Sequence, residues 1–193
     1  MTVRRNGIPL HNDTMTEPLS VPSIHEQLRA LLDREGATYR VVEHVPEGRT
    51  EYIAKIRGNR VEQAVKSIVV MIRFGKNEPR YVLANVPGDC RVDFKAIRAM
   101  YHGSQSAIAP REKAEELTGC VIGAIPPFRF NDKLDILADP LIQLNEEVVF
   151  NAGRLDRSIF MKCLDYFRIA KPRIEKIALS RGGVEPPSAM SAT

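Results

Sequence analysis

The sequence predicts one domain of mixed α/β (α+β) class, built around a curled sheet of about six to seven strands with surrounding helices. Three observations lead to this class. Strand patterns and helix patterns follow one another without the regular alternation of a doubly wound sheet. The chain has 193 residues, of which 44% are hydrophobic, enough for one core without disulfides or metal. Neither GxGxxG nor GxxxxGK[ST] occurs, which argues against a nucleotide-binding fold.

The first element is a helix that starts after Ser23. Ser23 and Glu26 have the spacing of a capping box, and apolar residues at positions 24, 28, 31 and 32 form one helical stripe that stops before Gly36. Seven segments then have strand character, namely residues 37–44, 67–74, 80–86, 104–109, 133–139, 146–153 and 157–161. The second and third of these flank residues 75–79, which predicts a hairpin of two central strands with a five-residue connection.

Four further helices are expected between these strands. Thr50 is placed to cap a short helix, and residues 93–101 carry apolar side chains at helical spacing. Residues 110–117 form a helix with a proline near its start and Gly119 after its end, and residues 163–170 form the last helix.

The ends of the chain differ from the middle. Residues 1–22 are polar and show no periodicity, so we expect a mobile tail before a domain that spans residues 23–172. The net charge is +4, yet residues 154–181 alone hold eight Lys and Arg against three Asp and Glu. We expect residues 173–193 to form a basic and then flexible tail. Such a basic segment attracts phosphates, although a solvated helix face is the commoner reason for one.

Composition excludes several classes of protein. No charge-free run reaches the roughly 18 residues of a membrane span, and the N-terminus lacks the apolar stretch of a secretory signal. We therefore expect a cytoplasmic protein without a membrane partner. The three cysteines are too widely spaced for a disulfide framework, and the four histidines show no metal-ligand spacing. No cofactor and no metal are expected.

Lys66 is the first candidate for chemistry. It opens the strand 67–74 and, by alternation, shares a face with the apolar residues 68, 70, 72 and 74. A buried ammonium costs several kcal/mol unless it has a partner. The side chain therefore either reaches a cavity or extends to solvent at the strand end, and the pattern alone favours the second.

The second candidate is the GxxxP loop that runs from Gly123 to Pro127 and includes Ala124 and Ile125. Glycine allows close approach to a ligand and the prolines stiffen the chain, so main-chain N–H groups can be held toward an oxyanion. A plain tight turn is the commoner meaning of this spacing alone.

The third candidate is the turn between the last two expected strands, FNAGRLDRSIF. In a functional interpretation Gly153 approaches a pocket closely, and Arg154 and Arg157 contact phosphates. An ordinary hairpin with surface arginines explains the same residues, and the pattern favours it. No GxSxG elbow occurs, and buried structural cysteines are the simpler account of the three thiols, so covalent catalysis has no support.

Six segments together resemble the YbaK and prolyl-tRNA-synthetase-associated editing-domain family. They are the EH pair at residues 43–44, the helix at Thr50, AVKSIVV, VPGDCRVDFKAI, TGCVIGAIPPF and NAGRLDRSI, in the family's order over roughly residues 25–170. The resemblance implies a mixed sheet curled into a partly closed barrel with helices outside. It also implies hydrolysis of mischarged aminoacyl-tRNA, commonly tRNA for proline that carries Ala or Cys.

Residue roles follow from the resemblance. Lys66 falls on the family's functional lysine, which binds the terminal adenosine or ester region, and Gly123 to Pro127 fall on its substrate loop. Gly153 falls on the glycine of the last hairpin. In this family a tRNA hydroxyl or the substrate itself helps with the proton, and an aminoacyl-tRNA synthetase is a potential partner.

The chain departs from the family's cysteine-editing branch. The resemblance implies that members of that branch have a Tyr two positions before the His and an Asp in the final strand. This chain has Val42 and Ser158 at these positions. No histidine follows His102, so Asn151 or Ser158 would take the place of a later histidine. The amino acid that is removed stays open.

Three functions compete. The favoured one is a trans-acting aminoacyl-tRNA deacylase with Lys66 at the ester, the Gly123 loop as gate and Arg154 and Arg157 near tRNA phosphates. The second is a module of the same fold that binds tRNA or nucleotide without hydrolysis. The third is a hydrolase of small esters, which the basic C-terminal segment disfavours.

Overall fold

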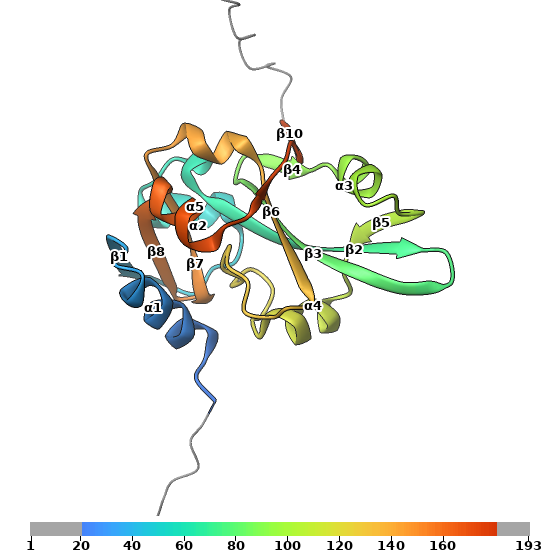
Figure 1. The fold of residues 1–193 in the computed structure, drawn as a ribbon. Helices are drawn as coiled ribbons and strands as arrows, with labels where there is room; N and C mark the ends of the chain where they lie inside the picture. Colours follow the sequence, from blue (N-terminus) through green and yellow to red (C-terminus); the bar gives the residue numbers. More distant parts are fainter. Residues whose placement is uncertain (1–20, 181–193) are drawn as a thin grey trace, which may run out of the picture.

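The computed structural model describes residues 21–180, in which helices surround three sheets (Figure 1). The strands are β1 (Tyr39–Glu43), β2 (Val65–Phe74), β3 (Asn77–Pro87), β4 (Cys90–Val92), β5 (Gln105–Ile108), β6 (Leu134–Ala138), β7 (Glu147–Arg154), β8 (Arg157–Lys162), β9 (Arg173–Ile174) and β10 (Ala178–Ser180). The helices are α1 (Ile24–Arg34), α2 (Thr50–Arg57), α3 (Phe94–Met100), α4 (Arg111–Thr118) and α5 (Cys163–Ala170).

The largest sheet has the order β5-β2-β3-β6-β9, and two smaller sheets have the orders β1-β8-β7 and β10-β4. β2 pairs antiparallel with β3 on one side and with β5 on the other, whereas β6 pairs parallel with both β3 and β9. The predicted mixed α+β class is confirmed. Within residues 21–180 the strands form separate sheets that do not close into a barrel.

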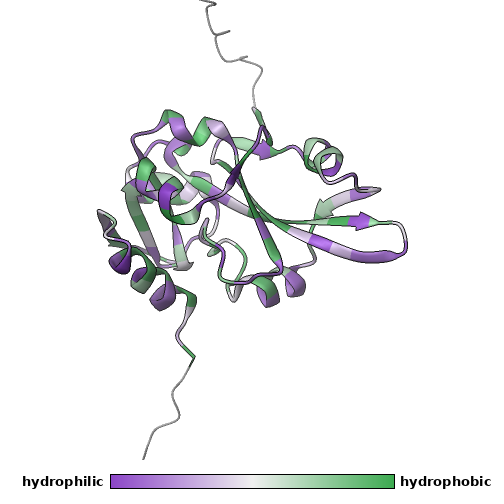
Figure 2. Ribbon diagram, viewed as in Figure 1, coloured by the Kyte–Doolittle hydropathy of each residue, from purple (hydrophilic) through white to green (hydrophobic). Residues whose placement is uncertain are grey.

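Helix α1 forms as its capping pattern predicts. The Ser23 side chain accepts the Glu26 main-chain N–H, and the Glu26 carboxylate accepts the N–H of Ser23 in return. Leu28 and Leu32 of the predicted stripe are fully buried. Hydrophobic residues follow the central strands, and hydrophilic ones occupy the outward turns of α1 and α4 (Figure 2).

The central hairpin is longer than predicted. β2 and β3 extend toward each other until Phe74 pairs with Asn77, so only two residues form the turn, and the predicted five-residue connection is wrong. The register shifts between Ile72 and Phe74, a bulge that accommodates Pro79 within the strand. Pro79 therefore lies in the irregular part of the ladder and does not end the strand.

Two other local expectations need correction. Thr50 does not cap α2, because Arg49 occupies the cap position and Thr50 is the first helical residue. The sequence does not predict β4, β9 and β10, since strands of two or three residues are too short to show a period.

The large sheet is buried on both faces. On one face, Val69 and Leu83 pack with Leu117 of α4, and on the other, Val70 and Val82 pack with α3. A separate apolar cluster joins α1 and α5 to the small sheet. Because both faces are covered, the exposed main chain of the sheet lies at its edges.

Residues 173–180 pack against the domain. The buried carboxylate of Asp139 accepts main-chain N–H bonds from Ile177 and Ala178, each at 2.7 Å, and from Leu141 at 2.9 Å. β9 then pairs with β6 and β10 with β4, so the part of the expected basic tail before residue 181 extends two sheets. Residues 1–20 and 181–193 of the expected tails lie outside the described residues. None of the helices in residues 21–180 is both long and apolar enough to cross a bilayer.

The Asp139 bonds predict the effect of one substitution. Asp139→Asn keeps the shape but replaces one acceptor oxygen with a donor group, so at least one buried N–H loses its partner, at a cost of about 1–3 kcal/mol of unfolding free energy. Urea denaturation measures the loss, and amide hydrogen exchange of Ile177 and Ala178 locates it. Asp132→Asn, at an exposed position, is the control. Unchanged protection of both amides would show that the carboxylate does not hold the C-terminal segment.

Candidate functional site

One cavity brings together four of the residues that the sequence singles out, namely Lys66, Gly123, Ile125 and Asn151. Its volume is about 240 Å³, and it lies between α2, the first half of β2, the loop 119–128 and β7. Apolar side chains form most of its walls. Lys66 and one further cation line it, and no aspartate or glutamate is among its lining residues.

The cavity exists because β2 is longer than its outer neighbour. β5 pairs with β2 only between residues 70 and 73, and the Ala109 N–H extends this pairing to the carbonyl of Val69. The earlier part of β2, residues 65–68, lines the cavity, and within residues 21–180 no strand pairs with this edge between the Ala109 bond and a single bridge from Ala64 to Val149 of β7. Its other edge is paired with β3 throughout. The strand that carries Lys66 is therefore held rigidly from one side and open to a ligand from the other.

Lys66 reaches the cavity at the start of this strand. Its ammonium donates to the carbonyl oxygens of Gly88, at 3.3 Å, and of Cys90. Burial lowers the pKa of Lys66, an effect that the nearby Cys90 and Asp89 oppose. Two of the three ammonium hydrogens are thus occupied by main-chain carbonyls, which leaves one for a ligand. Among residues 21–180 no ion pair neutralises this charge.

The GxxxP loop lies against Gly48 on the opposite wall. Gly123 has φ +88°, and a Cβ at this position would lie 2.7 Å from the Cα of Gly48. The N–H of Ala124 is bonded to Val121 and that of Ile122 to a glutamate, while the Gly123 N–H makes no hydrogen bond within the described residues. Of the main-chain donors at positions 122 to 124, only that of Gly123 is free to serve a ligand.

Asn151 connects the loop to β7. Its side-chain Nδ2 donates to the carbonyl oxygens of Gly123, at 2.8 Å, and Glu47, at 2.9 Å, although the residue is only 8% exposed. Its Oδ1 lies 3.0 Å from the hydroxyl of Ser158, which is fully buried on β8. A buried amide with every polar atom engaged fixes the distance between the loop and the sheet.

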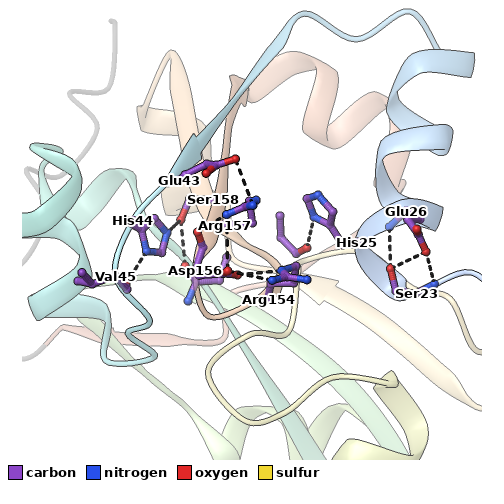
Figure 3. Close-up of polar contacts among 12 residues, drawn as sticks. Ser23, His25, Glu26, Glu43, His44, Val45, Arg154, Asp156, Arg157 and Ser158 are labelled. Atoms are coloured by element: carbon purple, nitrogen blue, oxygen red, sulfur yellow. Dashed lines mark hydrogen bonds and ion pairs between the residues drawn. The ribbon is translucent and has the colours of Figure 1, made fainter.

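His44 completes this buried network from outside the cavity (Figure 3). Its Nδ1 donates to the carbonyl oxygen of Val45 at 2.8 Å, and its Nε2 lies 2.7 Å from the hydroxyl oxygen of Ser158. Ser158 thus supports Asn151 from behind and does not line the cavity.

Three other predicted residues also lie outside the cavity lining. Ala124 and Pro127 belong to the loop and are buried without lining the cavity. Gly153 approaches α1, where a Cβ would meet the main-chain nitrogen of His25 at 2.9 Å. The Gly153 N–H donates to the carbonyl of Ala124 at 3.0 Å. The last hairpin glycine therefore allows α1, β7 and the loop to meet.

Arg154 and Arg157 are paired with carboxylates at the tip of the last hairpin (Figure 3). Arg154 binds Asp156 at 2.8 Å, and Arg157 lies 3.1 Å from Glu43. Neither lines the cavity. Because such partly exposed pairs contribute little energy, they do not prevent either arginine from meeting a phosphate, and the expected tRNA contact stays a prediction.

Arg57 is a charged lining residue that no sequence pattern indicates. It ends α2, and its Nη1 donates to Ser158 Oγ at 3.0 Å and to Asn151 Oδ1 at 3.4 Å. Burial lowers its pKa to about 10. An arginine in the last turn of a helix is ordinary, and no local pattern signals that its side chain turns inward.

The three thiols are unsuited to covalent chemistry here. Burial raises the pKa of Cys90 and of Cys120 to about 12 and that of Cys163 to about 11, so all three are protonated near neutral pH. None of them lines the cavity.

Known proteins resemble this chain over most of its length. The profile of the aminoacyl-tRNA editing domain family matches residues 44–169. The multifunctional Ser/Thr-tRNA deacylase ProXp-y of Escherichia coli K12 is 40% identical over 161 residues, which cover 83% of this chain and 96% of that protein. The protein of the same name from Escherichia coli O157:H7 matches equally well.

Two solved structures have the same fold. A hypothetical protein has a TM-score of 0.72 with 17% identity and covers 80% of this chain and 100% of its own. A candidate trans-editing enzyme for prolyl tRNA synthetase has a TM-score of 0.67 with 23% identity, with 84% of this chain and 100% of its own covered.

The contact between Gly48 and Gly123 predicts that alanine at position 123 lowers the free energy of unfolding more than alanine at position 75, a glycine with a similar positive φ but no close neighbour. Gly75→Ala meets nothing within 4 Å at φ +64°, so it reports backbone strain alone, about 1 kcal/mol. Gly123→Ala adds a main-chain clash to similar strain and should lower the free energy of unfolding clearly further. Urea denaturation of the two variants measures the difference. Equal losses would mean that the loop moves away from Gly48 without cost.

Proposed function

The chain belongs to the aminoacyl-tRNA editing domain family, and we propose that it is a trans-acting deacylase that hydrolyses the ester of tRNA charged with a small amino acid. The observation that carries the proposal is the small cavity itself. It joins a half-buried lysine, a main-chain donor at Gly123 and a wholly uncharged or cationic lining. Hydrolysis of an ester uses such groups to stabilise the oxyanion and needs no protein nucleophile.

The reaction follows from the polar groups at the cavity. A water oxygen bonds to the ester carbonyl carbon, and the carbonyl oxygen becomes an oxyanion that the Lys66 ammonium and the Gly123 N–H stabilise. The bond from this carbon to the ribose oxygen then breaks. The proton that water gives up is transferred to the ribose oxygen, by way of a tRNA hydroxyl or the substrate's own amine. The products are the free amino acid and uncharged tRNA.

The amino acid is the finer part of the proposal. We propose Ser and Thr first, because the 40% identical relative from Escherichia coli is named as a Ser/Thr-tRNA deacylase. The family resemblance of the sequence points instead to Ala or Cys on tRNA for proline. A cavity of about 240 Å³ admits small side chains of either kind and excludes large ones, as the second sieve of editing requires. A recruiting synthetase remains part of the proposal.

We predict that Lys66→Ala abolishes deacylation and leaves folding nearly intact. Loss of one oxyanion donor lowers the rate by about 100-fold or more, and the ammonium bonds only to carbonyls at the cavity edge. The measurement is release of amino acid from a panel of tRNAs charged with Ala, Cys, Ser or Thr, at one fixed salt concentration. Lys76→Ala, in the turn at the other end of the same strand, is the matched control.

The panel also separates the competing functions. Retained tRNA binding without turnover on any charged species would identify a binding module. Hydrolysis of simple esters at a rate that salt does not change would identify a small-ester hydrolase. A large loss of stability in Lys66→Ala with unchanged activity would remove Lys66 from the mechanism.

A further inference from the structure

Arg57 presents an unbalanced charge to the cavity. It and Lys66 are the two cations in the lining, no carboxylate lines the cavity, and neither residue forms an ion pair within residues 21–180. A guanidinium held away from water without a counter-charge is unfavourable. Such a group is expected where a ligand supplies the missing anion.

The hydrogen bonds of Arg57 leave one side of its guanidinium open. Nε donates to Asn59 Oδ1 at 3.1 Å, and Nη1 donates to Asn151 and Ser158. Nη2 makes no hydrogen bond in the described part of the chain. All three partners are neutral oxygens, so they fix the orientation of the plane without cancelling its charge. With a pKa of about 10, Arg57 is a cation at neutral pH.

The two cations are anchored on different elements. Main-chain carbonyls next to β4 hold the Lys66 ammonium, whereas side chains of β7 and β8 hold the Arg57 guanidinium. They can therefore serve different groups of one ligand. A lysine is a compact point charge that suits a developing oxyanion, whereas the planar fork of an arginine matches the oxygens of a phosphate.

We propose that Arg57 is the phosphate-binding residue of the cavity and that it takes the phosphodiester on the 5′ side of the esterified terminal adenosine. This inference rests on the proposed function. In a charged tRNA the phosphodiesters are the only permanent anions, and this one lies nearest to the ester. Binding it through Nη2 completes the hydrogen bonds of Arg57 and aligns the ester with Lys66.

Two minimal substrates test the assignment. Both are adenosine esterified on the ribose with serine, and one carries a 5′-phosphate. The wild type should hydrolyse the phosphorylated ester with kcat/KM at least about tenfold higher, the effect of one hydrogen bond between charged groups. Arg57→Gln should bring this ratio close to one, because it lowers hydrolysis of the phosphorylated ester far more than hydrolysis of the unphosphorylated one. Arg57→Lys should keep part of the preference.

Arg60→Gln is the matched control, since Arg60 is exposed, lies three residues further along the chain and does not line the cavity. It should keep the wild-type ratio. A wild-type ratio of one, or an equal loss on both esters in Arg57→Gln, would overturn the phosphate assignment. Equal losses would mean that Arg57 acts by holding Asn151 in place.

A binding measurement on the wild type tests the phosphate assignment even where a variant does not fold or no ester is hydrolysed. AMP should bind at least about tenfold more tightly than adenosine by calorimetry, which needs neither turnover nor a folded variant. Equal affinities would contradict the assignment. If no charged substrate is hydrolysed but AMP is preferred, the proposed deacylase function fails and the phosphate site stands.

Discussion

The amide of Asn151 is the contact on which the cavity depends. Its Nδ2 connects the main chain of the Gly123 loop and the main chain before α2 to β7. Its Oδ1 accepts a hydrogen bond from Arg57, the last residue of α2. Neither the Gly123 loop nor the main chain just before α2 is part of a strand at this point. A side chain that can donate twice and accept from two groups replaces the ladder that a strand would supply. Its burial makes each bond costly to lose.

The rigid support of the two cations has a consequence for the chemistry of the cavity. Because Asn151 and Ser158 hold Arg57, and main-chain carbonyls hold Lys66, both cations are oriented before any ligand arrives. A preorganised charge such as the Lys66 ammonium stabilises a developing oxyanion without the reorganisation that water would need. A site that works in this way needs no activated thiol, which agrees with the raised pKa values of the three cysteines.

Much of the fold could be predicted because its signals are local. The capping box at Ser23 and the run from Cys163 to Ala170 place two helices correctly, and period-two alternation places β2, β3 and β6. The short strands β4, β9 and β10 have no such signal. They form because their partners, and the buried carboxylate of Asp139, are already in place.

For the site, residue type and spacing alone indicate which residues are chemically unusual, namely a lysine at the start of an apolar strand and a glycine in a stiff loop. What those residues contact depends on how distant segments pack together. Gly153 approaches α1 instead of the cavity, Ser158 lies behind Asn151, and Arg57 turns inward. Each of these facts depends on a contact between segments far apart in the chain, where no local period or motif carries the information.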